Sequence, residues 1–471
     1  MRIVVPMTLP DAAPLSRRDW AIIVAITAAG CALRIAMAQG ALWLDEAWSA
    51  MHAHEVATPL GIFLGINHDN NHHLNSLWMQ AVGIDAPPLL QRALAIATGT
   101  ASIVVAARLM ARSGNVAAIV AAALFAFSPF FANYGSEARG YAPMILALLM
   151  VMLHVDRWLA GAPRPTTSLI LWAMIGMLSQ LMMAIGLVAV AGWAFVTLRQ
   201  RDGWRSAVRE TLRSFAPAAV AAAAVLGGIL LAARINSGGM RFGNLEPFTY
   251  FHQLKALFSV VGYTIGVPEI ELWPGLALLV ALGVAIRIRI DRLPLYWLAL
   301  IGFPIVVAIV HPANPGHARY YTLIAVAMLL MIADIAARGW SARGWLRAAA
   351  ATGIAAILVA SVVEDIRLIA NQRGDPGRAI TAMAALTPDG ATAFVERDSA
   401  VPVLATAART GQYPLAIRRS PCPAPDYLFI DRYNGESLPG PQRRCGRDYV
   451  PIATMRARGM TNFHWRLYRR R

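Results

Sequence analysis

The chain has 471 residues, of which 57% are hydrophobic and only 14% charged, and its mean hydropathy is +0.52. This composition excludes a soluble globular protein, in which about a quarter of the residues carry a charge. The formal charge of +16 comes almost entirely from arginine. Because the arginines punctuate apolar stretches and form no basic stripe, we expect no nucleic-acid partner.

Apolar stretches of about 17 to 22 residues, bounded by arginine or by Pro, Gly and Asn, predict a polytopic α-helical membrane protein with about eleven transmembrane helices. They lie near residues 20–39, 88–107, 115–131, 141–157, 167–181, 183–198, 214–233, 273–288, 293–310, 320–337 and 345–363. With the N-terminus in the cytoplasm, the cytoplasmic segments carry 18 Lys and Arg residues, and the outer loops before the C-terminal tail carry five. This asymmetry follows the positive-inside rule, and eleven helices place the C-terminus outside.

The first predicted helix has an alternative interpretation as a cleaved signal peptide, because it follows two arginines and ends in Ala-Met-Ala. Arg34 lies inside the apolar stretch and favours a retained helix that faces a protein interior. In either case Asp45 lies outside the cytoplasm.

From about residue 365 the composition changes to Pro, Asp, Arg and turn residues. We therefore divide the chain into a transmembrane domain, 1–364, and a small extracytoplasmic α/β domain, 365–471. Within the second domain the periodicity predicts helices at 375–386 and 401–409 and strands at 391–396 and 426–431.

Two of the three cysteines, Cys422 and Cys445, lie in this second domain. An extracytoplasmic environment is oxidising, which favours a structural disulfide over two free thiols. Such a bond would stabilise the domain by roughly 3.5 kcal/mol on the chain-entropy model. Cys31 lies in the first helix and is interpreted as an apolar filler.

Two adjacent carboxylates, Asp45 and Glu46, follow the first predicted helix on its outer side. Carboxylates at a membrane edge are expensive to desolvate, and one held there suits abstraction of a proton from an acceptor hydroxyl or amine. The alternative is a helix cap beside the interfacial tryptophans Trp43 and Trp48.

Glu137, Arg139 and Tyr141 lie at the outer turn between the third and fourth predicted helices. A guanidinium beside a carboxylate at that depth can bind a phosphate through two hydrogen bonds or orient a catalytic acid. The alternative is a local ion pair that closes a tight hairpin.

His317, Arg319 and Tyr320 open the tenth predicted helix from the same side. Arg319 would meet a lipid-linked phosphate at the depth of the lipid headgroups. The alternative is an aromatic-belt anchor with a snorkelling arginine.

A fourth polar cluster precedes the second predicted helix, in an outer segment without lysine or arginine. The i, i+4 spacing of His68 and His72, with Asp69 nearby, would suit a metal ion on a helix, but the asparagines between the histidines disfavour a helix. We therefore predict no metal site, and expect Asn71, His72 and His73 to contact a sugar and its phosphate.

These clusters all fall on the outer side, and together they resemble the GT-C superfamily of integral-membrane glycosyltransferases, in particular its bacterial protein-mannosyltransferase and aminoarabinose-transferase-like branch. The resemblance covers the membrane domain by architecture and about 25 residues by motif. It rests on the order Leu44-Asp45-Glu46-Ala47-Trp48, Asn71-His72-His73-Leu74, Glu137-Ala138-Arg139-Gly140-Tyr141 and Arg319-Tyr320, followed by a periplasmic tail. The family's usual His-Pro-Pro-Leu-Tyr segment is Asn71-His72-His73-Leu74-Asn75 here, so the prolines are missing and the sugar stays undetermined.

The resemblance implies a polyprenyl-phosphate sugar donor, inversion at the anomeric centre, and an active site on the periplasmic side of a bacterial cytoplasmic membrane. Asp45 would be the catalytic base, with Glu46 as its neighbour and Glu137 as a second acidic position. The donor phosphate would be stabilised by positive charge. We expect it at Arg139, Arg319 and Tyr320, and the substrate at Asn71, His72, His73, Tyr141 and His317. The acceptor would be a lipid, a glycan or a protein, and no cofactor is expected, since the chain has no glycine-rich phosphate loop.

The outer segment 234–272 contains Arg241, Lys255 and several aromatic residues and is a candidate cover for the cavity, or else an interfacial helix. The main rival function is a transporter or lipid flippase, which would show inverted repeats and ionisable groups near the middle of the bilayer. No Asp or Glu lies at the centre of a predicted helix, which disfavours transport. A scaffold protein would leave the outer charged clusters unexplained.

Overall fold

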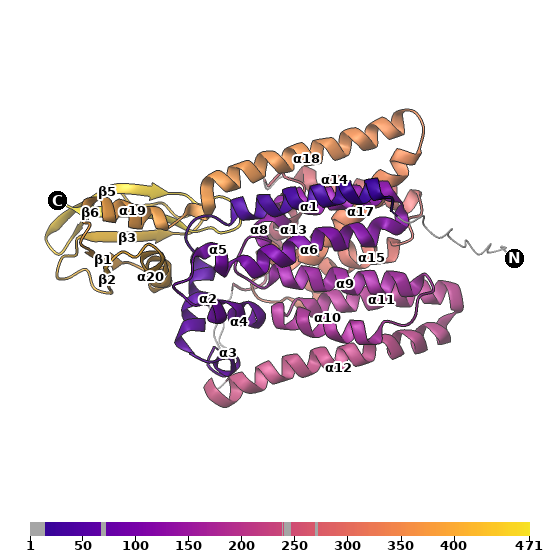
Figure 1. The fold of residues 1–471 in the computed structure, drawn as a ribbon, viewed down its shortest axis with the longest axis horizontal. Helices are drawn as coiled ribbons and strands as arrows, with labels where there is room; N and C mark the ends of the chain where they lie inside the picture. The colour runs from indigo at the N-terminus through magenta and orange to yellow at the C-terminus, as the bar shows by residue number, and fades with distance from the viewer. Residues whose placement is uncertain (1–14, 67–71, 238, 240–245, 269–271) are drawn as a thin grey trace.

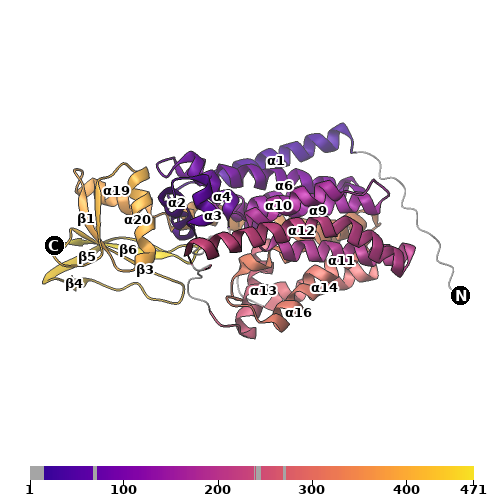
Figure 2. The same cartoon turned by 90° about the horizontal axis from the view of Figure 1, so that it is seen from below.

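The computed structural model describes residues 15–66, 72–237, 239, 246–268 and 272–471. Figure 1 shows an elongated molecule, with a helical bundle that takes up most of the length and a smaller domain with a β-sheet at one end. The first described helix, α1 (Arg17–Met37), begins at the other end of the bundle (Figures 1 and 2). We call the end of the bundle next to the smaller domain the sheet end.

Each of the eleven predicted transmembrane segments coincides with an apolar helix or helix pair. These are α1 (Arg17–Met37), α6 (Ala93–Met110), α7 (Asn115–Phe127), α9 (Tyr141–Leu159), α10 (Thr166–Ser179), α11 (Met183–Asp202), α12 (Trp204–Ser237), α14 (Leu272–Arg287), α15 (Leu293–Trp297) continued by α16 (Phe303–Val310), α17 (Thr322–Ser341) and α18 (Trp345–Asn371). Among the described residues, eight segments are long and apolar enough to span a membrane, whereas α7, α10 and α14 are shorter.

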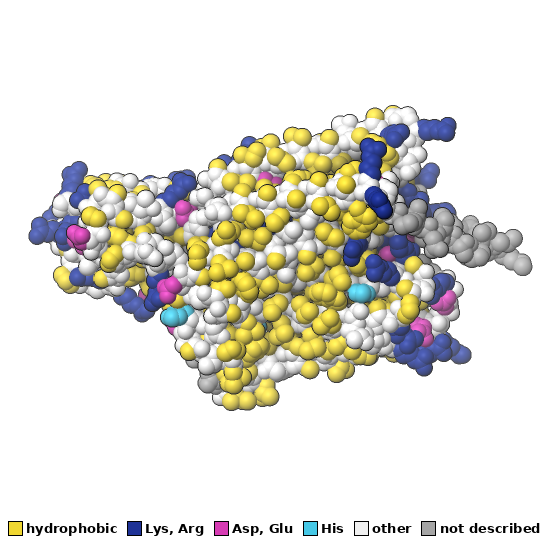
Figure 3. Space-filling model, in the orientation of Figure 1, with side chains coloured by type: hydrophobic (Ala, Val, Ile, Leu, Met, Phe, Trp, Pro, Cys, Tyr) yellow, Lys and Arg dark blue, Asp and Glu magenta, His cyan; other side chains and the backbone are white. Residues whose placement is uncertain are grey.

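The surface of the bundle has the pattern of an integral membrane protein. Figure 3 shows hydrophobic side chains over the middle of the bundle, and Lys and Arg side chains near the end where α1 begins and on the sheet domain. Large apolar side chains such as Val188, Val220 and Leu231 are mostly exposed, which is costly in water and favourable in lipid. The chain is therefore a multi-pass membrane protein.

Arg34 in α1 explains how a charged residue is accommodated inside the bundle. The third predicted segment, 115–131, breaks after Phe127, because Pro129 opens the short helix α8 (Pro129–Tyr134). The carbonyls of Phe125 and Ala126 lose their helical partners there, and the Arg34 guanidinium donates to both of them at 2.9 and 3.2 Å. The side chain thus faces the protein interior, as its position in the sequence predicts.

Short helices gather at the sheet end. They are α2 (Leu44–Glu55), α3 (Pro59–Leu64), α4 (His73–Val82) and α5 (Pro88–Gln91), as Figures 1 and 2 show. In addition, α13 (Tyr250–Thr264) packs against α8, α17 and the one-turn helix Ala318–Tyr321. The predicted outer segment 234–272 therefore contains a helix that packs on the bundle. Arg241 and one of the aromatic residues of this segment, Phe242, lie outside the described residues.

The C-terminal domain contains a six-stranded mixed sheet in the order β2-β1-β3-β6-β5-β4. Its strands are β1 (Ala391–Val395), β2 (Leu415–Arg418), β3 (Tyr427–Arg432), β4 (Gln442–Arg444), β5 (Arg447–Met455) and β6 (His464–Arg470). β1 pairs in parallel with β2 and β3, and the other pairs are antiparallel. The predicted helices appear as α19 (Gly377–Leu386) and α20 (Val401–Thr410), and both predicted strands are present as β1 and β3.

The membrane part and the sheet domain are joined without a linker. α18 continues to Asn371, so the boundary predicted at residue 364 falls inside a helix. Just after it, the buried Arg373 guanidinium donates to the carbonyls of Met37, Asn133 and Ser136 at 2.7, 3.0 and 3.2 Å. The sheet domain is thereby fixed to the end of α1 and to the turn between α8 and α9.

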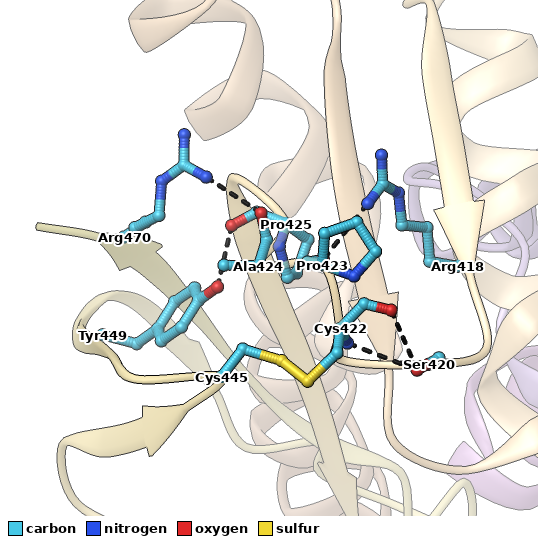
Figure 4. The surroundings of a disulfide bond; sticks show 9 residues. All are labelled: Arg418, Ser420, Cys422, Pro423, Ala424, Pro425, Cys445, Tyr449 and Arg470. Atoms are coloured by element: carbon cyan, nitrogen blue, oxygen red, sulfur yellow. Dashed lines mark hydrogen bonds between the residues drawn. A yellow bond between two sulfur atoms is a disulfide. The ribbon is translucent and has the colours of Figure 1, made fainter.

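Figure 4 shows the disulfide that joins Cys422 to Cys445, with Cα atoms 5.6 Å apart. Cys422 lies between β2 and β3, and Cys445 lies in the turn between β4 and β5, so the bond ties the β4–β5 hairpin to the start of β3. Tyr449 adds a hydrogen bond from its hydroxyl to the carbonyl of Pro425, at 2.8 Å. Cys31 is a free, half-buried cysteine in α1.

Candidate functional site

A cavity of about 520 Å³ lies between the sheet end of the bundle and the C-terminal domain. Its walls come from α2, from α13, from the segment before α17, and from two loops of the sheet domain. The polar residues among its lining are Asp45, Tyr134, Glu246, His252, Lys255, Ser259, Tyr263, His317, Arg319, Tyr433, Asn434, Thr461 and Asn462. Of the predicted site residues, the cavity is lined by Asp45, His317 and Arg319.

Asp45 is the second residue of α2, and its carboxylate is held by two arginines. One oxygen, Oδ2, accepts a hydrogen bond from Arg139 and another from Arg319, the latter at 2.9 Å. Burial alone would raise the pKa of Asp45, but the charges of Arg139 and Arg319 outweigh it and hold the pKa below its usual value. Asp45 is therefore a charged group with two cationic partners from distant parts of the chain.

The turn that carries Arg139 depends on a glycine. A Cβ atom on Gly140 would clash with the carbonyl oxygen of Ser179 at the end of α10, so only glycine allows this approach. The next residue, Tyr141, begins α9 and lies with its ring 5.3 Å from the Arg139 guanidinium carbon. The predicted Arg139-Gly140-Tyr141 motif thus fixes the direction of the arginine toward Asp45.

Glu137 lies in the same turn and is almost fully buried. Its Oε2 accepts a hydrogen bond from Asn133 at 3.3 Å, whereas Oε1 has no hydrogen-bond partner within the described chain. Burial raises the pKa of Glu137 to about 7, although Arg139 and Arg373 act in the opposite direction. This carboxyl is therefore poised to change its charge near neutral pH.

Arg319 and Arg139 are not saturated by Asp45. In the described part of the chain, the buried Nε atom of each guanidinium has no hydrogen-bond partner. Tyr320 lies with its ring 5.6 Å from the Arg319 guanidinium carbon, and His317 borders the cavity beside it. Burial, with Arg319 adding to it, lowers the pKa of His317 to about 4, so the imidazole is neutral.

Glu46 occupies a different environment from Asp45, although the two residues are adjacent. Its carboxylate is fully buried and accepts from Arg92 Nε at 2.9 Å and Nη2 at 2.5 Å. The backbone N–H groups of Trp43 and Ala138 donate to the same carboxylate at 3.2 and 2.7 Å. With its acceptor positions filled and no contact with the cavity, Glu46 fits a structural role and not the predicted catalytic one.

The predicted histidine cluster lies behind the site and not on the cavity wall. His72 Nδ1 donates to the Ser179 carbonyl at 3.1 Å, and its ring meets Tyr141 edge-on at 5.1 Å. His73 stacks on Phe63 at 5.2 Å, and burial lowers its pKa to about 4. This placement supports packing around Tyr141 and gives no support to direct contact between these histidines and a sugar.

The other residues of that cluster, Asn71, His68 and Asp69, lie outside the described residues. Within the residues that are described, the structure contains no group of three or more His, Cys, Asp or Glu side chains that could hold a metal ion.

Sequence reasoning missed two features of the site. Arg92 falls within the second predicted helix, 88–107, and is therefore missing from the count of Lys and Arg in the outer loops. In the structure α6 begins only at Ala93, so Arg92 lies at the sheet end of the bundle. The lining residues from the sheet domain, Tyr433 and Asn434 in one loop and residues 459–462 in another, follow no motif and are brought to the cavity only by the tertiary fold.

No family model and no curated protein sequence matches the chain. Among solved structures, the chain is similar to the cryo-EM structure of arabinofuranosyltransferase AftD from Mycobacteria, with a TM-score of 0.51 and 16% identity over 98% of this chain and 40% of that one. The chain therefore spans about two fifths of the length of AftD. Crystal structures of ArnT from Cupriavidus metallidurans also match. The apo form has a TM-score of 0.49, 14% identity and coverage of 95% of this chain and 97% of that one. The form bound to undecaprenyl phosphate has a TM-score of 0.48 and 13% identity, and the match covers 96% of this chain and 98% of that one.

The structural similarity to GT-C glycosyltransferases thus extends over nearly the whole chain, at low sequence identity. At this identity the likeness establishes the fold, which is the one that the sequence motifs predict.

Proposed function

We propose that the chain is a glycosyltransferase that moves a sugar from a polyprenyl-phosphate donor to an acceptor hydroxyl or amine, at the outer face of a bacterial cytoplasmic membrane. The observation that carries this proposal is the cluster of Asp45, Arg139 and Arg319 beside a cavity at the end of an apolar bundle. The likeness to an arabinofuranosyltransferase fold is in keeping with it.

The two arginines suit the phosphate of the donor. Two guanidinium groups share one oxygen of Asp45, and the Nε–H of each guanidinium still lacks a hydrogen-bond partner in the described chain. A phosphate accepts several charge-assisted hydrogen bonds, and arginine presents its donors in a fork that fits such an anion. The lipid tail would remain alongside the apolar helices.

Asp45 suits the role of general base. An acceptor oxygen attacks the anomeric carbon and the bond from that carbon to the phosphate oxygen breaks. The bonding electron pair leaves with the polyprenyl phosphate, and the acceptor proton passes to Asp45. Attack from the side opposite to the leaving group inverts the anomeric centre. Arg139 and Arg319 stabilise the charge that develops on the departing phosphate.

The arginines also link donor binding to the strength of the base. Without a donor, both guanidinium groups lower the pKa of Asp45 and make it a poor proton acceptor. When a phosphate recruits them, the carboxylate loses part of this stabilisation and its affinity for a proton rises. The base is then strongest when the donor is in place.

The distribution of the arginines supports a proposal for the side of the membrane on which the site lies. The 18 Lys and Arg residues assigned to the cytoplasm outnumber those of the outer loops, even when Arg92 is added to the original five. The start of α1 and the end of α18 also lie at opposite ends of the bundle (Figure 1), as an odd number of crossings requires. We therefore assign the sheet end to the periplasm.

The proposal is tested by incubating purified full-length protein with a panel of polyprenyl-phosphate sugars and measuring released polyprenyl phosphate by mass spectrometry. We expect release with at least one donor, and release that is slower by about two to four orders of magnitude from an Asp45→Asn variant. Asp389→Asn is the matched control, because Asp389 is an exposed carboxylate of the sheet domain. Movement of intact donor across a liposome membrane without release would instead identify a flippase.

A further inference from the structure

The C-terminal domain forms one wall of the cavity, and this wall differs chemically from the others. Its lining residues are Tyr433, Asn434, Gly459, Met460, Thr461 and Asn462, none of which carries a charge. The opposite walls carry Asp45, Arg319, Glu246 and Lys255. The cavity thus has a charged side formed by the membrane part and a neutral polar side formed by the sheet domain.

A chain of hydrogen bonds orients the two asparagines of the neutral wall. His464 Nδ1 accepts from the backbone N–H of Ala457 at 3.0 Å, so the neutral ring carries its proton on Nε2. That Nε2–H donates to Asn434 Oδ1 at 2.7 Å, and Asn434 Nδ2 donates in turn to Asn462 Oδ1. Burial of His464, with the charge of Arg456 nearby, lowers its pKa, which keeps the ring in this neutral form.

This arrangement leaves hydrogen-bond donors available at the cavity. Each amide oxygen accepts one hydrogen bond from the protein, and within the described residues the Nδ2 group of Asn462 donates to no protein atom. An amide nitrogen carries two hydrogens, so Asn462 retains two donors and Asn434 retains one. These groups need oxygen acceptors from water or from a ligand.

The neutral wall is held in a fixed position relative to Asp45. Asn371, at the end of α18, donates to the carbonyl of Arg456 at 2.9 Å and accepts from the N–H of Arg458 at 2.7 Å. On the other side of the domain, Trp48 of α2 donates to the carbonyl of Ser399 at 3.0 Å. Because Asp45 and Trp48 share one helix, the base and the neutral wall are parts of one rigid frame.

We infer that this wall is the acceptor subsite, and that the acceptor is a neutral, hydroxyl-rich carbohydrate held by Asn434 and Asn462. The inference rests on the proposed function and specifies the acceptor class for the same site. Sugar hydroxyls both accept and donate, so they fit a wall of oriented amides and a threonine, and Tyr433 adds an aromatic surface.

The position of the wall assigns it to the acceptor and not to the donor. The donor phosphate belongs beside Arg139 and Arg319, and its lipid tail must follow the apolar helices. The sheet domain lies beyond the end of the bundle (Figures 1 and 2), so a ligand part that touches it extends away from the membrane. The acceptor is the reactant with such a part, and its attacking hydroxyl must lie within reach of Asp45.

The chemistry of the wall argues against a phosphorylated acceptor. A phosphate group at this position would need cationic partners, and the residues that line this wall supply only neutral donors. A serine-containing peptide would use its backbone for pairing, whereas no strand edge of the sheet is among the lining residues.

The test measures ligand binding apart from turnover. Saturation-transfer NMR is recorded on the full chain in lipid nanodiscs with a mixture of methyl α-D-mannopyranoside, methyl α-D-arabinofuranoside and methyl β-D-galactofuranoside. The variants are Asn434→Ala and Asn462→Gly. Glycine is chosen at 462 because the backbone there has φ = +56°, which alanine would strain. Gln442→Ala is the control, an amide in β4 that bonds only its local backbone carbonyls.

We expect saturation transfer to at least one glycoside with wild type and with Gln442→Ala, and a signal that is weaker by about fivefold or more in both asparagine variants. No binding to wild type, or equal binding to all four proteins, would overturn the inference. So would displacement of the glycosides by inorganic phosphate or by a Gly-Ser-Gly peptide at equal concentration.

The donor-release assay on the same samples separates the two proposals. Release of polyprenyl phosphate with unchanged glycoside binding in the variants would leave the glycosyltransferase function standing and reject the acceptor subsite. Asparagine-dependent glycoside binding without release from any donor would support the carbohydrate subsite and reject the proposed transfer.

Discussion

Arg92 holds the carboxylate of Glu46 through two hydrogen bonds, and neither side chain is more than 1% exposed. The remaining N–H groups of Arg92 donate to the carbonyls of Ala38, Gly40 and Ala41 at the end of α1, at 2.8, 2.8 and 3.0 Å. This pair therefore fixes the start of α2, and with it the residue directly before Glu46, which is Asp45.

Removal of one partner from the Arg92–Glu46 pair should destabilise the protein strongly. Glu46→Ala leaves a buried guanidinium without its counter-charge, at a cost of about 3–5 kcal/mol. We expect a large fall in the thermal unfolding midpoint in detergent and a low folded yield. Glu46→Gln should be milder, and its transfer per folded molecule should stay within about tenfold of wild type. A larger loss in well-folded Glu46→Gln would restore a catalytic role.

Asp45→Asn should abolish the chemistry and preserve the fold. Asparagine is nearly isosteric and cannot take the acceptor proton, so transfer should fall by about two to four orders of magnitude. Donor binding should survive, because Arg139 and Arg319 are unchanged. Asp45→Glu should be partly active at most, because the extra methylene displaces the carboxylate.

Transfer and donor binding must be measured side by side for Asp45. Wild-type transfer by Asp45→Asn would reject the base assignment. Loss of folded protein in this variant would show that the carboxylate is structural, with Asp45→Glu as the second variant that keeps the charge.

Arg139→Lys and Arg319→Lys should weaken the apparent affinity for the donor by about 10- to 100-fold, because lysine keeps the charge but loses the planar fork. The Arg139 side chain is only 10% exposed and lies between two carboxyls, so its variant should lose more thermal stability than the Arg319 variant, whose side chain is 22% exposed. Arg447→Lys, an exposed change in β5, is the control. Full activity in both site variants would reject the phosphate-binding role and would favour the alternative, in which the arginines are anchors at the membrane interface.

Glu137 predicts a specific dependence of stability on pH. Its carboxyl has an ordinary pKa near 4.5 when unfolded and about 7 when folded. The folded protein therefore holds this proton more tightly than the unfolded chain. The resulting stabilisation is complete below pH 4.5 and is lost as the pH rises through 7, on the order of 3 kcal/mol in total.

The comparison with Glu137→Gln isolates this group from the other titrating residues. Unfolding midpoints of both proteins are measured from pH 4.5 to 8. We expect the wild-type midpoint to decline relative to that of the glutamine variant as the pH rises. Parallel profiles would mean that the carboxyl titrates near its ordinary value.

A reporter enzyme that is active only in the periplasm should be active when it is fused after Arg471, and a reporter that is active only in the cytoplasm should be inactive there. The expectation comes from the arginine asymmetry and from the odd number of apolar helices. Mass mapping of the same protein from a bacterial membrane should recover Cys422 linked to Cys445. Activity of a cytoplasmic reporter at this position would contradict the odd number of crossings, and persistent free thiols would remove the support that the disulfide gives to a periplasmic domain.

The sequence allowed accurate prediction of features that depend on local pattern. Each apolar stretch predicted a helix, because the bilayer requires about 20 apolar residues in a row and the arginines mark their ends. Asp45, Arg139 and Arg319 could be proposed as site residues because each lies in a short motif at a helix end. The contact of both arginines with Asp45 could not be predicted from a local motif, because Arg139 is 94 residues and Arg319 is 274 residues away from Asp45 in the sequence.

The failures have a common physical origin in tertiary packing. Glu46 and Asp45 are neighbours in sequence, but consecutive residues of a helix point in different directions, so one faces the cavity and the other faces Arg92. Arg92 itself was hidden inside a predicted helix. Asn434 and Asn462 lie in loops whose approach to the cavity depends on the register of β3, β6 and β5, which no local pattern specifies.

The junction between α18 and the sheet domain has a consequence for protein engineering. Arg373 and Asp375 belong to the C-terminal part of the chain, yet their side chains bond Met37, Asn133 and Ser136 and the N–H of Ala41 in the membrane part. A chimera joined at residue 364 would replace Arg373 and Asp375 by residues of another protein. The hydrogen bonds to the end of α1 and to the segment before α2 would be lost, and the position of Asp45 would change. Exchange of the sheet domain between relatives should instead place the crossover after Gly377, so that the native anchor stays with its own membrane helices.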